Sequence, residues 1–219
     1  MGIQTNEHKN IWNTHIELFR DKLSDYKIKS YNDNYSAVIM ETREHPHLET
    51  VIKNTMYFLN ESDSNKKWKL ELFHGNLNEE YCKKIVDGID NVELHHVDYD
   101  YMIVNDYDNL FRTTDFWKMI TSDNILIFQT DAITCGQSKF NIENFYQYDF
   151  VGAPVSKTIR YLLQVLFISK GTIVGHTQFY NGGLSFRKKS AALRVIDKYP
   201  WDEKITEDVW FCAFLPRVG

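Results

Sequence analysis

Long apolar runs are missing from this chain of 219 residues. The longest candidate, residues 162–168, is interrupted by Gln164, whereas a helix needs about 20 apolar residues to cross a bilayer. The first residues also lack the short apolar run and small-residue cleavage site of a secretion signal. These two absences exclude a membrane span and predict an intracellular, cytoplasmic protein.

Cysteine is scarce, and charge is not gathered into blocks. Cys82, Cys135 and Cys212 are odd in number and share no close spacing, which argues against a disulfide framework and a cysteine-based zinc site. The 25 Lys and Arg against 30 Asp and Glu give a net charge of −5. This balance disfavours nucleic-acid binding driven by bulk charge.

Several catalytic motifs are absent as well. The chain has no H-E-x-x-H zinc motif, no nucleotide P-loop and no G-x-S-x-G nucleophile elbow. Kinase and hydrolase functions therefore lose their main support. The histidines at positions 45, 47, 95 and 96 follow no zinc spacing, so surface or loop positions are expected for them.

What the sequence does contain is an alternation of short apolar runs and helical patterns from residue 35 onward, which predicts βαβ units and an α/β fold with a mostly parallel sheet flanked by helices. The expected strands are 37–40, 69–73, 92–97, 125–128, 149–152 and 184–187. The expected helices are 48–59, 79–85 after an Asn78 cap, 105–120, 142–148, 189–198 and a last one after a Thr206 cap. A turn is expected at 153–154, and residues 156–178 are expected to form a long loop with a short helix near 161–167.

An amphipathic helix is predicted over residues 7–24. Trp12, Ile16, Phe19 and Leu23 recur at spacings of four, three and four, which draws one apolar stripe along it. Either this stripe packs on its own domain or it makes a subunit contact in a homo-oligomer. We therefore expect an accessory helix and connector over residues 1–34 and the main domain over residues 35–219.

Chemistry is expected where the apolar strand 125–128 ends, because open α/β sheets bind ligands beyond the carboxyl ends of their strands. Gln129, Thr130 and Asp131 follow this strand directly. Asp131 could hold a divalent cation against a diphosphate, since hard cations prefer oxygen ligands. The alternative is a loop aspartate that caps a turn.

Three further groups are candidates for binding or catalysis. A tight turn is predicted at Asn181, Gly182 and Gly183, and its backbone amides could bind a phosphate or a sugar hydroxyl. The same residues are also typical of an ordinary β-hairpin turn. The acidic pair at 207–208 stands near a predicted helix start, where the helix dipole alone would favour it. After the first strand come Glu41, Thr42 and Arg43, of which Arg43 could pair with a phosphate or make a surface salt bridge.

Taken in order, these elements resemble the series of motifs of a known protein family. The matching segments are 38–43 with Pro46, 68–78 with Gly75, Phe116-Trp117 leading into 125–131, 151–154, 181–187, and Glu207-Asp208 with Phe211. They are similar to a glycosyltransferase-like family, long catalogued as a domain of unknown function, with viral, fungal and bacterial members and a GT-A type nucleotide-sugar fold. The resemblance covers roughly residues 35–215, and for a viral member it implies the host cytoplasm or the virion as the location.

The resemblance implies roles for the candidate residues. The D-x-D signature corresponds to Gln129-Thr130-Asp131, with Asp131 as the metal-binding second acid. Gln129 replaces the first acid, and its neutral amide gives less charge with which to hold the Mn²⁺ or Mg²⁺ that the resemblance implies. GT-A metal sites often add a histidine near the C-terminus, for which His176 is a remote substitute. Glu207-Asp208 looks like the x-E-D element, in which the second acid is the general base for an acceptor hydroxyl.

By this likeness the chain is a glycosyltransferase that moves a sugar from a nucleotide-diphosphate donor, with UDP expected as the nucleotide, to a hydroxyl acceptor. Glu41, Thr42 and Arg43 are then expected near the nucleotide, and residues 181–183 near the donor sugar or acceptor. One alternative is a catalytically silent relative that binds a glycan or a protein. A second is a nucleotidyltransferase, which would need a glycine-rich loop after its first strand, and residues 42–47 contain no glycine.

Overall fold

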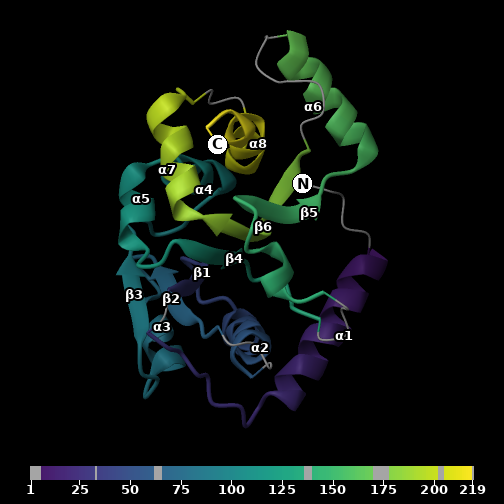
Figure 1. Cartoon of the computed structure of the whole chain (residues 1–219). Coiled ribbons are helices and arrows are strands. Elements are labelled where there is room, and N and C mark those ends of the chain that lie inside the picture. Colours follow the sequence, from purple (N-terminus) through teal and green to yellow (C-terminus); the bar gives the residue numbers. More distant parts are fainter. Residues whose placement is uncertain are drawn as a thin grey trace.

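A six-stranded sheet with the strand order β3-β2-β1-β4-β6-β5 forms the centre of the structure (Figure 1). The computed structural model describes residues 6–32, 34–61, 66–135, 140–169, 178–201 and 205–218. The strands are β1 (Tyr35–Met40), β2 (Lys69–His74), β3 (Val92–His96), β4 (Asn124–Phe128), β5 (Phe150–Pro154) and β6 (Tyr180–Lys188). Strands β1 to β4 pair in parallel, and β6 is antiparallel to both of its neighbours. The predicted α/β domain with a mostly parallel sheet flanked by helices is confirmed.

Two hydrophobic cores lie on the two faces of the sheet, because successive strand residues point to opposite faces. In β4, Ile125 and Ile127 belong to one core and Leu126 and Phe128 to the other. The first core is covered by α4 (Val104–Phe111), α5 (Thr114–Met119), α7 (Lys189–Lys198) and α8 (Glu207–Phe214), and the second by α1 (Asn6–Lys22), α2 (Leu48–Asn60) and α3 (Glu79–Val86) (Figure 1). The short 3-10 helices are η1 (Ile142–Phe145) and η2 (Leu215–Arg217).

The N-terminal helix α1 packs on its own domain. Ile16 is fully buried in the second core, and the ring of Phe19 meets that of Phe58 on α2 edge to face at 6.4 Å. Arg20 also contacts the imidazole of His47 at 3.2 Å, just before α2. The apolar stripe of α1 is thus accounted for within the chain, and a homo-oligomer through this helix stays a prediction.

The single helix expected over 105–120 is instead two helices. Helix α4 ends at Phe111, and α5 begins at Thr114. Between them, the hydroxyl of Thr113 accepts the amide of Phe116 at 3.3 Å and caps the second helix. A Thr in this position favours a helix start over a continuous helix, because its short polar side chain competes for backbone donors.

The short helix expected near 161–167, within a long loop over 156–178, is confirmed but is longer than predicted. Residues Lys157–Ser169 form the helix α6, which extends away from the sheet (Figure 1). Most of its described apolar side chains face solvent rather than a core. In the described ranges, no helix is long and apolar enough to cross a bilayer. His176 lies outside the described residues.

Both turns expected near the end of the sheet are part of strands. Ala153 and Pro154 belong to the edge strand β5, where a proline is tolerated. Asn181, Gly182 and Gly183 lie in β6, which shifts register where Gly152 pairs with Ser185 and Ala153 with Asn181. Positive φ is absent from the two β6 glycines, so they do not form the expected hairpin turn.

Two predicted helix caps also differ. The Asn78 side chain does not cap α3. Instead, it accepts the amide of Gly75 and donates to the carbonyl oxygens of Glu41 and Arg43. The Thr206 hydroxyl accepts no amide of α8 and donates to the carboxylate of Asp208. Asn78 thus bonds to the distant segment after β1, whereas Thr206 bonds to a side chain two residues away instead of to a helix amide.

Candidate active site

One edge of the sheet carries the predicted site residues. The parallel strands β1 and β4 end there with Met40 and Phe128, and the antiparallel strand β6 begins there. Residues 41–43 and 129–131 therefore leave the sheet at the edge where residues 181–183 enter it. Loops at the carboxyl ends of strands are where open α/β sheets bind ligands.

The segment after β1 is held rigidly by its own side chains. The buried Glu41 carboxylate accepts the Arg43 guanidinium through Nε at 2.7 Å and Nη2 at 2.8 Å, and the Arg43 amide at 3.0 Å. The Thr42 hydroxyl accepts the Met102 amide at 3.0 Å. The hydrogen bonds to Glu41 raise the pKa of Arg43, and the guanidinium lies 5.7 Å from the ring centroid of Tyr101. Arg43 is thus an oriented, half-exposed cation at the edge of the sheet.

The segment after β4 adjoins this cation. The Thr130 hydroxyl lies 3.5 Å from Oε2 of Glu41, which connects the ends of β1 and β4. Asp131 is exposed and acts electrostatically on His45. Burial lowers the pKa of His45, and the carboxylates of Glu41 and Asp131 oppose that shift. Asp131 therefore stands at the β1 side of the site, open to solvent.

Gln129 faces the β6 side. Its Oε1 would lie 2.7 Å from a Cβ placed on Gly183, so the two residues are in close contact. The Asn181 side chain accepts the Gly183 amide at 2.9 Å. The Gln129 side chain is also hydrogen-bonded to Tyr107 of α4, whose pKa is raised by burial and by the nearby Glu207 carboxylate. Sequence reasoning missed Tyr107, which carries no motif.

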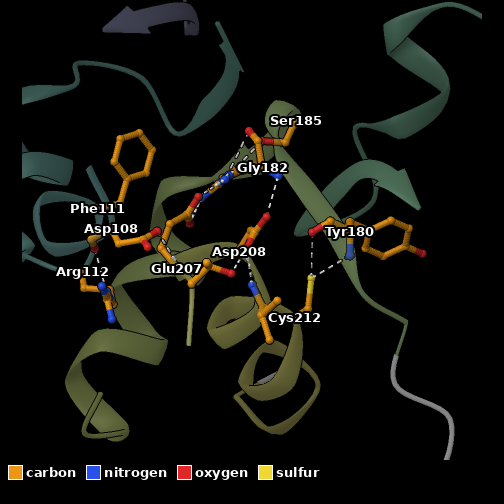
Figure 2. A network of polar contacts seen from close by, with 12 residues as sticks. Asp108, Phe111, Arg112, Tyr180, Gly182, Ser185, Glu207, Asp208 and Cys212 are labelled. Carbon is orange, nitrogen blue, oxygen red and sulfur yellow. Dashed lines mark hydrogen bonds and ion pairs between the residues drawn. The ribbon is translucent and has the colours of Figure 1, made fainter. Parts of the chain in front are cut away.

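Asp208 ties the start of α8 to β6 (Figure 2). Its Oδ2 accepts the Gly182 amide at 3.0 Å, and its Oδ1 accepts the Thr206 hydroxyl at 2.5 Å and the Val209 amide at 2.7 Å. The carboxylate is therefore fixed in one orientation. Oδ2 receives one of the three hydrogen bonds and keeps acceptor capacity for a further proton.

Glu207, the other member of the acidic pair, points into the protein. It makes a bidentate ion pair with Arg187 at 2.6 and 2.8 Å, and both side chains are buried. Burial lowers the pKa of Arg187, but the Glu207 carboxylate outweighs this effect and raises it, so the guanidinium stays charged. The Arg187–Glu207 ion pair lies directly against Gly182, since a Cβ on that glycine would collide with both side chains.

Asp108 and the remaining contacts of Arg187 complete the support. Asp108 of α4 accepts the Glu207 amide at 3.0 Å and so satisfies a donor at the start of α8 (Figure 2). Burial raises the pKa of Asp108. Arg187 lies 4.6 Å from the ring centroid of Phe150 and donates from Nε to Ser185 at 2.9 Å. In the sequence, Arg187 is only a charged residue within a predicted strand. Such a residue is equally consistent with a side chain that faces solvent.

The predicted residues thus form three groups along one edge. The first contains Glu41 to Arg43 with Thr130 and the nearby Asp131, the second Gln129 with Asn181 and Gly183, and the third Gly182 with Glu207 and Asp208. No hydrogen bond or ion pair connects Asp131 to Asp208 within the described ranges. In the same ranges, no three His, Cys, Asp or Glu side chains are grouped so that they could hold a metal ion.

Comparison with solved structures finds similarity to the mannosyltransferase PcManGT from Pyrobaculum calidifontis in complex with GDP-Man and Mn²⁺, at 13% identity and a TM-score of 0.48. The match covers 93% of this chain and 59% of the mannosyltransferase chain, so this chain spans less than two thirds of that protein. No curated protein matches. The family model described as a protein of unknown function, DUF5672, matches residues 91–218. The chain therefore belongs to the DUF5672 family.

Proposed function

We propose that the protein is a glycosyltransferase of GT-A type that moves a sugar from a nucleotide-diphosphate donor to a hydroxyl acceptor. In this proposal residues 35–219 are the catalytic domain and residues 1–34 an accessory segment. The main support is the convergence, along one edge of the sheet, of a fixed cation after β1, the segment after β4, and a fixed carboxylate at the start of α8.

The nucleotide and its diphosphate are assigned to the β1 side of the site. Arg43 is the charged donor there, and its pairing with Glu41 orients it so that the guanidinium edge not used by Glu41 can meet a phosphate. Thr42 and Thr130 belong to the same side. Asp131 is assigned to the diphosphate region through a divalent cation.

The residues present fit a cation that is held largely by the substrate. Asp131 supplies one exposed carboxylate, whereas the side-chain oxygen of Gln129 faces Gly183 on the β6 side. Such a cation would take its other ligands from the diphosphate and water, as Mg²⁺ often does. When bound, it would stabilise negative charge on the departing diphosphate. UDP is our proposed nucleotide, with Mn²⁺ or Mg²⁺ as the cation.

The acceptor is assigned to the β6 side. In the transfer step the acceptor oxygen bonds to the anomeric carbon, the bond from that carbon to the diphosphate oxygen breaks, and the nucleoside diphosphate leaves. The acceptor proton passes to Oδ2 of Asp208, which the Gly182 amide holds in place. Asn181 and Gly183 lie beside Gln129, and we assign the donor sugar to this part of the site.

Glu207 acts through its neighbours in this proposal. Its carboxylate is occupied by Arg187, and the pair forms the floor beneath Gly182. Glu207 is therefore a positioning residue for Asp208. This role replaces the catalytic role that the sequence suggested for Glu207.

Calorimetry tests the donor assignment. We expect UDP to bind in the presence of Mn²⁺ and UDP-sugar to be hydrolysed slowly to UDP. GDP and GDP-mannose are the second pair to measure. Heat of binding that is absent at millimolar concentrations of both nucleotides would remove the donor assignment, and binding unchanged in Asp131→Ala would remove the role of Asp131.

The second candidate function is that of a catalytically silent relative that binds a glycan or a protein, because Gln129 occupies the position where the resemblance implies an acid. It predicts nucleotide or glycan binding with no release of free nucleotide from any donor tested. Hydrolysis that is present in the wild type and lost in Asp208→Asn would decide for the enzyme.

A further inference from the structure

A buried asparagine holds the loop that follows β4. Asn54 lies in the middle of α2, and its side chain is fully buried. Its Oδ1 accepts the amide of Thr134 at 2.7 Å, and its Nδ2 donates to the carbonyl oxygen of the same residue at 3.3 Å. One side chain therefore satisfies both backbone groups of one loop residue, as a neighbouring β-strand would.

The loop held in this way carries Asp131. The amide of Ala132 donates to the carbonyl oxygen of Gln129 at 3.0 Å, which closes a four-residue turn with Asp131 as its third residue. The buried strand β4 comes before this turn. After it, Ile133 packs against the second core, directly before the contact with Asn54. The exposed carboxylate of Asp131 thus stands on a turn that is fixed at both ends.

The residue type at position 54 is explained by the loop and not by the helix. Val51, Ile52 and Met56 of α2 are buried in the second core, where a side-chain amide is costly unless it is hydrogen-bonded. Both hydrogen bonds of the Asn54 amide go to Thr134. Asn offers a donor and an acceptor on separate atoms, which a peptide group requires of a single partner, whereas an apolar residue offers neither.

We infer that Asn54 is a positioning residue that fixes Asp131 for the cation of the proposed donor site. Asp131 acts without a second acid in its turn, because position 129 is a glutamine. A lone carboxylate binds more strongly when its loop is ordered beforehand, since ordering a loop at the moment of binding opposes the binding. The role of Asp131 rests on the proposed function, whereas the contact between Asn54 and Thr134 does not.

Hydrogen exchange without nucleotide or cation tests the contact itself. In the wild type, the Thr134 amide should exchange at least about tenfold more slowly than in an unfolded peptide, because Asn54 accepts it. In Asn54→Ala this protection should be lost in peptides that cover residues 129–135. Exchange of the wild-type Thr134 amide at the rate of an unfolded peptide would overturn the inference, and this measurement needs no variant.

Asn60, on the same helix, provides a matched control. It is 2% exposed, its Oδ1 accepts the amide of Trp68 at 2.8 Å, and its Nδ2 donates to the carbonyl oxygen of Trp68 at 3.1 Å. This contact has the same form but precedes β2, at the edge of the sheet opposite to the end of β4. Asn60→Ala should therefore lower the melting temperature as Asn54→Ala does, with unchanged exchange in residues 129–135.

Calorimetry with UDP and with GDP tests the consequence for the site. Each nucleotide is titrated in Mn²⁺ and in a chelator. The proposed function predicts that Mn²⁺ strengthens binding to the wild type and that Asp131→Ala loses this gain. Asn54→Ala should lose about tenfold of the gain, which corresponds to ordering about one further residue at binding, and should keep the affinity measured in the chelator. Asn60→Ala should keep the whole gain.

The outcomes separate Asn54 from the proposed function. A gain from Mn²⁺ that is equal in Asn54→Ala and in the wild type would overturn the inference and leave the role of Asp131 intact. A wild type that gains nothing from Mn²⁺ would remove the role of Asp131 and the inference together. Equal losses in Asn54→Ala and Asn60→Ala would also overturn the inference, because lower stability would then explain the weaker binding.

Discussion

The amide of Gly182 on β6 donates to Oδ2 of Asp208 on α8 at 3.0 Å, and this bond connects the sheet to the helix that carries the proposed base. The contact is possible because residue 182 has no side chain. A Cβ there would come within 2.6 Å of Oε1 of Glu207 and would also collide with Nη2 of Arg187. The glycine thus allows three functional groups to lie around one backbone position.

Replacing this glycine should therefore disrupt the site. We expect Gly182→Ala to lower the free energy of unfolding by about 2 kcal/mol or more, because the added methyl forces the buried pair to move. Gly183→Ala is the matched control, since its Cβ would meet the end of the Gln129 side chain, which can rotate away. Chemical denaturation of both variants measures the difference. Equal losses of stability would show that Arg187 and Glu207 do not constrain residue 182.

The buried ion pair gives a second test. Arg187→Met leaves the Glu207 carboxylate buried without its partner, which should cost about 3–5 kcal/mol of the free energy of unfolding. The double variant Arg187→Met/Glu207→Leu removes both charges and should regain most of that loss. A double-mutant cycle in urea measures the coupling. Additive losses would contradict a strong interaction between the two side chains.

The architecture was largely predictable from the sequence, because strand burial leaves a strong apolar pattern. The run 125–128 is apolar throughout and is the central strand β4, buried on both faces. Of helix α6, the sequence predicted only the part near 161–167. Its described apolar side chains at 159, 161, 162 and 165 are exposed, and nothing local in the sequence reports that the helix stands away from a core.

The site was only partly predictable. Motifs identified the residues that end or begin strands at one edge, since strand order brings 41–43, 129–131 and 181–183 together. They did not identify Tyr107, Asp108 and Arg187, which act through long-range contacts. Glu207 and Asp208 are neighbours in sequence, yet one carboxylate points into the core and the other towards Gly182. A sequence pattern does not report that division.

The proposed base supplies a third prediction. Asp208→Asn should lower the rate of sugar transfer or donor hydrolysis by about 10²- to 10⁴-fold, because the acceptor proton loses its acceptor, while nucleotide affinity stays the same. Asp115→Asn on α5 changes an exposed aspartate away from the edge and serves as the control. Melting temperatures of both variants are needed, since the Asp208→Asn side chain would keep only one oxygen for the amides of Gly182 and Val209. A rate within about twofold of the wild type would exclude Asp208 as the base.

A buried carboxylate outside the site gives a pH prediction. Glu71 on β2 accepts hydrogen bonds from Ser36 at 2.5 Å, from the Thr121 hydroxyl at 2.7 Å and amide at 3.0 Å, and lies 2.8 Å from Nε2 of His95. Burial alone raises its pKa, but these hydrogen bonds outweigh burial and lower the pKa below its ordinary value of 4.5. The unfolded chain therefore binds the proton more readily than the folded one. The resulting stabilisation is fully present above pH 4.5 and is lost as the pH falls through the pKa of the folded state.

Glu71→Gln removes this titration. The free energy of unfolding of the wild type should fall more steeply below pH 4.5 than that of the variant, although the variant is less stable at neutral pH because an amide cannot accept all four hydrogen bonds. Urea unfolding between neutral pH and about pH 3 measures both curves. Glu80→Gln, at a side chain that is 87% exposed, should run parallel to the wild type. If Glu71→Gln also runs parallel, its carboxylate does not carry the acid sensitivity, and the hydrogen bonds around it do not favour the charged form.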